Sequence, residues 1–341
     1  MKNGLLGIQF NIEKARLDGK VQNLAHYINE STLKSVHKKM DWKKAKGIDE
    51  ISKDDYAVNL EVNIGNLVKR MKNDSYRPKP SRRAYIPKDG SKKKRPLGIS
   101  CYEDKLVESV VADILNQVYE PKFFNESYGF RPNRNCHQAV RQIIENVQYR
   151  KVNYIVEADI KGFFDNVNHD WLMKFLEHDI ADKKFIDISK KFLKAGIMDK
   201  GKYLDSEHGT PQGNGASPIL ANIYLHYLLD YWFSARVKRQ CEGEAYLVRY
   251  CDDFVCCFQN KSEAEEFYIQ LIERFRKFGL ELALEKTKIL EFGRFAKENR
   301  ARRGLSKPET FDFLGFTFFI VVRMVISNFF DVKLRLAERN L

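Results

Sequence analysis

Two adjacent aspartates, Asp252 and Asp253, interrupt an otherwise apolar stretch that runs from Ala245 to Phe258. The flanking segments AYLVRY and FVCCF have the composition of β-strands, which predicts a hairpin with both acids at its tip. A carboxylate beside buried strands must be paired or must bind a cation, because its transfer out of water is costly. The stretch therefore predicts a cation site. The alternative is an ordinary turn, since Asp is a common turn residue.

A third acid stands in a similar place. The short apolar run from Tyr154 to Ile160 predicts a strand with Glu157 and Asp159 on one side and Asp159 at its end. Together with the hairpin pair, Asp159 could hold two Mg²⁺ ions about 3.5–4 Å apart, the arrangement that supports nucleotidyl transfer. Mg²⁺ suits such a site because it prefers oxygen ligands and shares them with substrate phosphates.

The positive charge of the chain is concentrated in one segment. The formal net charge is +13, and residues 69–95 hold twelve lysines and arginines against two acids. Tyr76 and Tyr85 lie among the basic residues, which favours a structured surface that contacts nucleic-acid phosphates over a merely solvated charged face. The charge thus predicts a polyanionic partner.

The remaining composition indicates a reduced protein with no membrane span. Six cysteines show no CxxC pair and no metal-ligand spacing with histidine, which predicts reduced core thiols. We find no run of about 18 apolar residues and no signal-peptide pattern at the N-terminus, so we expect a cytoplasmic protein.

Periodicity predicts an α+β fold. Helices are expected over most of residues 1–75 and from Leu106 to Val118, and a hairpin from Tyr85 to Ser100 turns at Asp89-Gly90. Further segments are a helix at 218–233, strand-like stretches at 279–292 and 310–322, and a polar end at 331–341 whose composition fits a helix.

Seven motifs in fixed order resemble those of group II intron reverse transcriptases, over roughly residues 45–320. They are KKKRPLGIS (92–100), SYGFRPNRNCHQA (127–139), EADIKGFFDNVNH (157–169), GTPQGNGASPILANIYLHYLLD (209–230), LVRYCDDFV (247–255), LELALEKTKI (280–289) and FDFLGFTF (311–318). The resemblance implies a right-hand polymerase fold, in which an antiparallel palm sheet packs on helices. It implies an N-terminal extension and fingers at 1–150, a palm at 151–320, and a C-terminal stub or start of a thumb at 321–341, so that the thumb is missing or reduced.

The resemblance also implies the activity of an RNA-directed DNA polymerase. Asp159, Asp252 and Asp253 take the positions of the metal ligands, with the backbone carbonyl of Ile160 as a further ligand, for two Mg²⁺ ions or alternatively Mn²⁺. Lys286 resembles the residue that protonates or neutralises the leaving pyrophosphate, a role that Lys288 could equally fill.

Other residues are carried over to the nucleotide and to the nucleic acid. Phe164, five residues after Asp159, falls at the steric-gate position, and ordinary core packing beside Phe163 is its alternative role. The expected dNTP-binding residues are Lys88, Lys93, Arg95, Phe163, Phe164 and Gln212. The expected primer grip is Phe313, Leu314, Gly315 and Phe316, and the expected template-binding residues are Lys92, Lys94, Tyr128 and Arg131. For Tyr128 and its neighbour Phe130, packing in the core is the alternative role. For the lysines assigned to dNTP, nonspecific template contact is an equal alternative.

The expected partners are an RNA template, a DNA or RNA primer and dNTPs, with intron RNA or a protein that supplies thumb function as further candidates. Asn214 and Cys251 depart from the commoner PQGG and YADD patterns of the family. Three other functions compete: a domesticated, CRISPR-linked or defence reverse transcriptase, an RNA-binding maturase-like splicing cofactor, and an RNA-dependent RNA polymerase.

Overall fold

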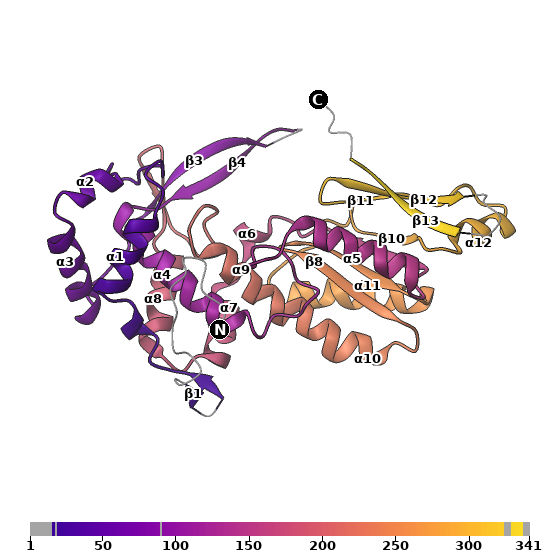
Figure 1. Ribbon diagram of the computed structural model, residues 1–341, viewed down its shortest axis with the longest axis horizontal. Helices are drawn as coiled ribbons and strands as arrows, with labels where there is room; N and C mark the ends of the chain where they lie inside the picture. Colours follow the sequence, from indigo (N-terminus) through magenta and orange to yellow (C-terminus); the bar gives the residue numbers. More distant parts are fainter. Residues whose placement is uncertain (1–15, 18, 89–90, 324–328, 337–341) are drawn as a thin grey trace. The chain divides into compact units, whose positions relative to one another are not determined.

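The computed structural model describes residues 16–17, 19–88, 91–323 and 329–336, and the chain divides into two compact units (Figure 1). The first unit comprises Met1–Lys122 and Phe164–Tyr224, and the second comprises Phe123–Phe163 and Leu225–Leu341. Each unit is therefore built from two separate segments of the chain. The division into fingers and palm at residue 150 follows motifs rather than contacts, and it remains a prediction.

Helices dominate the described part of the first unit. The longest, α4 (Tyr102–Tyr119), is buried on almost every side, which explains its dense apolar sequence from Leu106 to Val118. It ends just before Pro121, which cannot continue a helix. The other helices are η2 (Ala25–Tyr27), α1 (Glu30–Lys39), α2 (Lys53–Ala57), α3 (Leu60–Lys72), α7 (His169–Asp179), α8 (Lys183–Leu193) and α9 (Ser217–Leu225), with α6 (Phe163–Asn166) at the junction with the second unit.

The sheet of the first unit has the order β4-β3-β6-β7 in the part of the chain that the structure describes. The strands are β3 (Ser81–Lys88), β4 (Ser91–Ile99), β6 (Ile197–Asp199) and β7 (Lys202–Leu204), and a short pair, β1 (Arg16–Leu17) and β2 (Lys20–Val21), lies apart from them. The predicted hairpin at 85–100 is confirmed, although its turn at Asp89-Gly90 lies outside the described residues. It begins earlier, because Ser81 and Arg82 also pair in parallel with β6, a partner more than 100 residues away.

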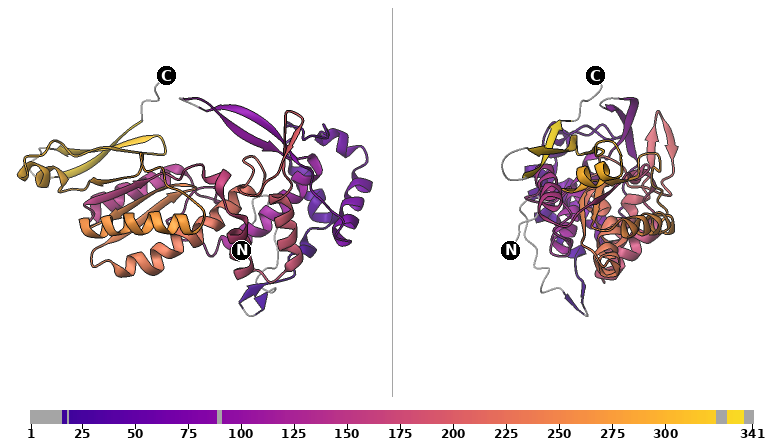
Figure 2. Two further views of the ribbon diagram at one scale, coloured as in Figure 1. Left: turned by 180° about the vertical axis from the view of Figure 1, so that it is seen from behind. Right: turned by 90° about the vertical axis from the view of Figure 1, so that its right-hand side faces the viewer.

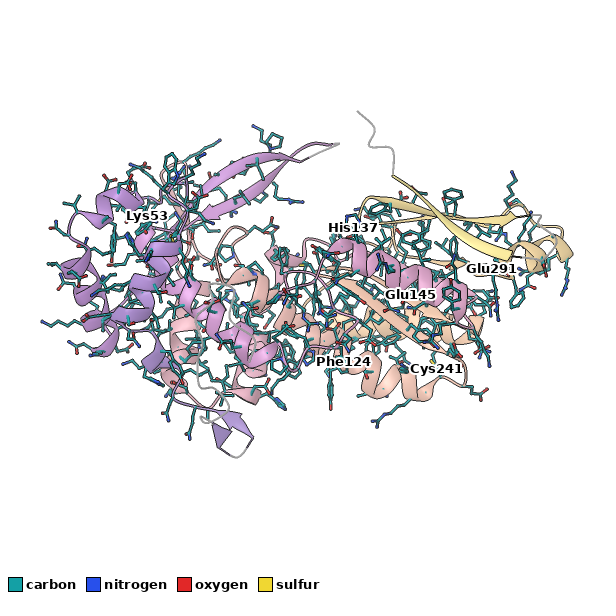
Figure 3. All side chains as sticks on the ribbon, in the orientation of Figure 1. Lys53, Phe124, His137, Glu145, Cys241 and Glu291 are labelled. Atoms are coloured by element: carbon teal, nitrogen blue, oxygen red, sulfur yellow. The ribbon has the colours of Figure 1, made fainter. Side chains whose placement is uncertain are left out.

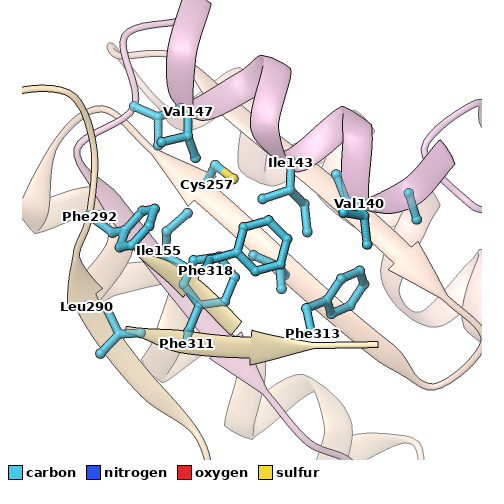
Figure 4. Packing of buried hydrophobic residues seen from close by; sticks show 14 of the residues in the cluster. Val140, Ile143, Val147, Ile155, Cys257, Leu290, Phe292, Phe311, Phe313 and Phe318 are labelled. Atoms are coloured by element: carbon cyan, nitrogen blue, oxygen red, sulfur yellow. The ribbon is translucent and has the colours of Figure 1, made fainter. Parts of the chain in front are cut away.

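A second sheet, with the order β10-β5-β9-β8, forms the centre of the second unit. Its strands are β5 (Tyr154–Ala158), β8 (Ala245–Tyr250), β9 (Asp253–Phe258) and β10 (Lys288–Glu291), and all neighbours are antiparallel. Helix α5 (Cys136–Tyr149) packs on one face, where Val140, Ile143 and Val147 meet Ile155 and Cys257 (Figure 4). Helix α11 (Lys261–Lys277) covers the other face (Figure 2), so the strands are apolar on both sides.

A third sheet, β11-β12-β13, closes the core on the side of α5. Its strands are β11 (Phe311–Phe313), β12 (Phe316–Arg323) and β13 (Phe329–Leu336), and the ring of His137 on α5 lies 5.9 Å from that of Phe316 (Figure 3). The helix expected from residue 331 is wrong for the described residues, because that segment pairs with β12 in antiparallel register. The strand-like stretch at 279–292 is a strand only from Lys288 to Glu291.

The helix predicted at 218–233 is confirmed and continues further. Helix α9 leads into two π-helical segments, η3 (His226–Asp230) and η4 (Phe233–Val237), and then into α10 (Lys238–Gln240). A short helix, α12 (Ala296–Arg302), completes the described helices of the second unit. π-Helical turns are uncommon and are found often at functional sites.

Candidate active site

Asp159 and Asp253 lie at the ends of two paired strands. The last pair between β5 and β9 joins Ala158 to Phe254, so the next opposite positions in this antiparallel register are Asp159 and Asp253. Directly opposite residues share a face of the sheet, with Cβ atoms roughly 4.5–5.5 Å apart. The strand register therefore brings together two of the three acids predicted from the sequence.

The third acid lies in the turn between β8 and β9. Tyr250 pairs with Asp253, which leaves Cys251 and Asp252 as a two-residue turn. Cys251 has a φ of 58°, a left-handed conformation that few residues other than glycine adopt. Its side chain is buried, whereas Asp252 is half-buried and Asp253 is exposed. The turn thus leaves both carboxylates accessible to solvent and buries the thiol of Cys251, which precedes them.

Lys286 reaches the acidic residue at the end of β5. Its Nζ lies 2.6 Å from Oδ2 of Asp159, and the backbone N–H of Ala283 donates to the carbonyl of Asp159 at 2.8 Å. The hydrogen bond to Asp159 raises the pKa of Lys286, and the charges of Asp159, Glu285 and Asp253 act in the same direction. Lys286 is therefore a protonated ammonium within the field of the acidic residues.

The structure separates Lys286 from its alternative, Lys288. Lys288 lies on β10 opposite Glu157, and its Nζ is 3.8 Å from Oε2 of Glu157. Burial raises the pKa of the Glu157 carboxyl, and the charge of Lys288 opposes this rise. Of the two lysines, Lys286 is the one bonded to a predicted metal ligand.

Two observations fit a divalent cation at these carboxylates. The ammonium of Lys286 already occupies an oxygen of Asp159, which shows that the position attracts a cation. The donors are carboxylate oxygens, the ligands that Mg²⁺ prefers. Within the described ranges no three His, Cys, Asp or Glu side chains come close enough together to hold a metal ion by themselves. An open set of acids suits Mg²⁺, which usually completes its shell with water and substrate phosphates. Ile160 is buried in a bridge with Leu282, so only its backbone could serve as a ligand.

The predicted template role of Tyr128 and Arg131 is not supported. Both side chains are buried, and the guanidinium of Arg131 donates to the carbonyls of Phe124 and Ser127 at 2.6 and 2.7 Å. The loop instead contacts the β8–β9 hairpin, because the N–H of Tyr128 donates to the carbonyl of Arg249 at 2.8 Å. Core packing, the alternative role of the two aromatic residues of this motif, is confirmed for Tyr128 and is wrong for Phe130, which has 49% of its surface exposed.

The two phenylalanines after Asp159 differ in exposure. Phe163 is buried at 2% exposure, so a contact with dNTP is not supported, because its ring is enclosed by protein. Phe164 is half-buried, and its carbonyl accepts a hydrogen bond from the N–H of Thr210 at 2.7 Å. The gate role of Phe164 remains a prediction.

The loop that carries Gln212 is tied to β4. The N–H of Gly98 donates to the carbonyl of Gln212 at 2.6 Å. Gly213 has a φ of 104°, and a Cβ there would lie 2.9 Å from the carbonyl oxygen of Gly98. The positive φ and the close approach both require a glycine at position 213. Gln212 itself is half-buried and remains a predicted dNTP contact.

Glu108 holds the Gln212 loop in place, and the sequence analysis did not identify it. Its carboxylate lies on α4 at 2% exposure and accepts hydrogen bonds from the Ser100 hydroxyl at 2.6 Å, the Asn214 amide at 2.7 Å and the Gly215 N–H at 3.2 Å. The signal was an acid at an apolar position of a core helix. Asn214, noted only as a departure from the family pattern, supplies one of these bonds.

The remaining predicted residues lie on two hairpins. Lys94 and Arg95 are exposed on β4, while the side chains of Lys88, Lys92 and Lys93 lie outside the described part of the chain. The predicted primer grip is the β11–β12 turn, in which Leu314 and Gly315 have φ values of 52° and 80°. Phe313 is buried, Leu314 and Phe316 are partly buried against the core, and Gly315 is the exposed residue of the turn. These roles remain predictions.

The fold and the acidic residues point to one class of protein. Three acids lie at the ends of antiparallel strands, and a lysine is bonded to one of them, which is the arrangement expected for two-metal nucleotidyl transfer. The chain belongs to the reverse transcriptase family: the family model described as "Reverse transcriptase (RNA-dependent DNA polymerase)" matches residues 86–318. Reverse transcriptases use divalent metal ions and bind a nucleic-acid template and primer. No described helix is long and apolar enough to cross a membrane.

Similar proteins indicate the group II intron type. The group II intron-encoded protein LtrA of Lactococcus lactis subsp. cremoris is 43% identical over 178 residues, which are 52% of this chain and 29% of that protein. Protein YkfC of Escherichia coli K12 is 32% identical over 273 residues, which are 71% of each chain. Among solved structures, telomerase from Candida albicans shares the fold with a TM-score of 0.55 at 12% identity, over 87% of this chain and 52% of that one.

Proposed function

We propose that this chain is an RNA-directed DNA polymerase of the group II intron type. The 3′-oxygen of a primer attacks the α-phosphorus of a dNTP paired to an RNA template, and the bond from that phosphorus to the bridging oxygen breaks to release pyrophosphate. The observation that carries this proposal is the register that sets Asp159 opposite Asp253, with Asp252 in the adjoining turn.

The three aspartates would hold two Mg²⁺ ions, with Mn²⁺ as the alternative and the Ile160 carbonyl as a further ligand. Bound there, such ions would lower the pKa of the 3′-hydroxyl and balance charge on the phosphates. Lys286 is kept protonated by its hydrogen bond to Asp159, which raises its pKa. Once Asp159 binds a cation, that ammonium is free to neutralise or protonate the leaving pyrophosphate.

The partners follow from the same reaction. RNA template, primer and dNTPs are the substrates, and intron RNA is the proposed native template because of the similarity to an intron-encoded protein. The exposed Lys94 and Arg95 on β4 are placed to contact phosphates. We propose a cytoplasmic location, since RNA, dNTPs and reduced thiols meet there.

Primer extension on a defined RNA template tests the proposal. We expect the wild-type chain to extend a DNA primer with dNTPs, and Asp252→Ala to lose roughly 10³-fold or more in rate, because metal ligands act on the transition state. The matched control is Asp187→Ala, which removes an exposed acid from α8. A wild type that incorporates NTPs in preference to dNTPs would overturn the assignment to DNA synthesis.

Phe164→Val separates a steric gate from ordinary packing. As a gate, the ring excludes the 2′-hydroxyl, so the smaller side chain should raise kcat/KM for NTPs relative to dNTPs. If Phe164 is only a packing residue, Phe164→Val should instead lower kcat/KM for NTPs and for dNTPs together, and it should lower the melting temperature. The ratio of the two kcat/KM values, measured on one template, decides between these roles.

A further inference from the structure

Arg249 is a charged residue at the centre of the second unit. It precedes the turn of the catalytic hairpin by two positions, and its side chain is 0% exposed. A buried guanidinium is strongly unfavourable unless every part of it is paired. The hydrogen-bond partners of Arg249 therefore indicate its role in the structure.

The guanidinium joins three segments of the chain. Nε and Nη2 donate to the two oxygens of Asp230 at 2.7 and 2.5 Å, which is a bidentate ion pair. Nη2 also donates to the Ser127 hydroxyl at 2.8 Å, and Nη1 donates to the carbonyl of Cys251 at 2.8 Å. The pair thus links η3, the 126–131 loop and the turn that carries the acids.

The contact with Cys251 acts on the acids directly. Cys251 holds the left-handed φ of the turn, and its carbonyl belongs to the peptide that leads into Asp252. A donor on that carbonyl fixes the plane of the peptide and hence the direction in which Asp252 and Asp253 project. The backbone of Arg249 is bonded as well, from its N–H to Glu126 at 2.9 Å and from the Tyr128 N–H to its carbonyl at 2.8 Å.

Asp230, the partner of Arg249, is itself held in place by neighbouring elements. Asp230 is the last residue of the π-helical segment η3, and Arg274 on α11 donates to the backbone carbonyls of Leu228 and Tyr227 in that segment. The support therefore runs from α11 through η3 and Asp230 to Arg249. Each step is a contact between rigid elements.

We propose that Arg249, held by Asp230 and Ser127, is a positioning residue that sets the catalytic hairpin for metal binding. This inference rests on the proposed function and deepens it. Lysine cannot replace arginine here, because an ammonium lacks the planar fork that serves Asp230, Ser127 and Cys251 together. A role limited to folding would be satisfied by any substitution that preserves stability.

The test uses the full chain with three variants: Arg249→Lys, Ser127→Ala and, as a matched control, Arg239→Lys on the exposed end of α10. Mn²⁺ affinity is measured by electron paramagnetic resonance, and kcat and KM by primer extension across Mg²⁺ concentrations. We expect Arg249→Lys to weaken Mn²⁺ binding and lower kcat about 10–100-fold, as loss of outer ligand support does, with KM for dNTP little changed. Ser127→Ala should shift both in the same direction by a few-fold, with a smaller fall in melting temperature than Arg249→Lys, because the guanidinium keeps its bonds to Asp230 and Cys251.

A folded Arg249→Lys variant with wild-type Mn²⁺ affinity and kcat would overturn the positioning role. If that variant does not fold, Ser127→Ala decides, because an unchanged Mn²⁺ affinity and kcat there would overturn it equally. A third outcome is that the wild-type chain does not extend primers but binds Mn²⁺, and that Arg249→Lys binds it more weakly. This outcome would count against the proposed reaction alone and would leave the positioning role in place.

Discussion

Two buried polar clusters support two functional loops, and they handle charge in opposite ways. The Arg249 cluster, which consists of Arg249, Asp230, Ser127 and the Cys251 carbonyl, contains one positive and one negative group in direct contact. The Glu108 cluster, which consists of Glu108, Ser100, Asn214 and the Gly215 N–H, supports the Gln212 loop with one carboxyl group and neutral partners.

The two clusters differ in how their charge is balanced. Arg249 is held by the counter-charge of Asp230, so the support of the β8–β9 hairpin depends on an ion pair. Burial raises the pKa of Glu108 to about 8, and the hydrogen bonds from Ser100 and Gly215 oppose that rise. The support of the Gln212 loop therefore depends on the protonation of Glu108.

Among these variants, Asp230→Ala should lower the free energy of unfolding the most. It leaves the guanidinium of Arg249 buried without its counter-charge, which should cost about 3–5 kcal/mol. Glu108→Gln leaves no charge behind and should cost roughly 1–3 kcal/mol at pH 7. Urea denaturation of both variants measures the contrast, and equal losses would break it.

A double variant sharpens the same contrast. Replacing both charges, as in Asp230→Leu with Arg249→Met, should recover most of the stability, because well-packed apolar groups often equal a buried ion pair. Activity should not recover if the pair positions the hairpin. Recovery of kcat along with stability would show that the pair serves folding alone.

A smaller effect is expected from the glycines that touch each cluster. A Cβ on Gly129 would lie 2.3 Å from the backbone nitrogen of Cys251, so Gly129→Ala must displace the catalytic turn. We expect a loss of about 1–3 kcal/mol in unfolding free energy, as for other overpacked sites, together with a lower kcat. Gly215→Ala is the control, because its Cβ would come no closer than 3.6 Å to Glu108. A Gly129→Ala variant with wild-type stability and kcat would contradict the close approach.

Local sequence predicted the elements that have a strong apolar pattern, and it missed a strand whose composition is polar. The β8–β9 hairpin and helix α4 follow from apolar periodicity and from their boundaries. β13 was expected as part of a helix, because its polar composition does not reveal that β12 pairs with it along its whole length. Tertiary pairing overrode local propensity there.

The site was predictable where chemistry requires an unusual residue. Acids in apolar strands marked Asp159, Asp252 and Asp253, and the strand register then brought Asp159 and Asp253 to opposite positions. Exposure was not predictable, because a motif does not show which side of a loop is enclosed, and Tyr128 and Arg131 are buried for that reason. Glu108 shows the converse, since its acidic character in a core helix was visible but its partners were 8 and 106 residues away.

The smallest expected effect at neutral pH is the pH dependence contributed by Glu108. Its pKa is about 8 in the folded protein against an ordinary 4.5, so folding favours the protonated form. The stability that this provides is complete below about pH 4.5 and is lost as pH rises through 8. Glu108→Gln cannot titrate, so its disadvantage relative to wild type should shrink as pH rises.

The titratable groups near Glu108 set the pH range in which its effect on stability is measured. Asp104 on the same helix has a pKa raised by burial to about 6 and accepts a hydrogen bond from Tyr76, and Lys105 opposes the effect of Asp104 on Glu108. Urea midpoints are therefore compared between pH 6.5 and 8.5, above the titration of Asp104. Wild type should lose stability over this interval more steeply than Glu108→Gln, while Glu177→Gln, which changes an exposed acid on α7, should keep the wild-type slope. Parallel slopes for wild type and Glu108→Gln would mean that Glu108 is ionised throughout this pH range.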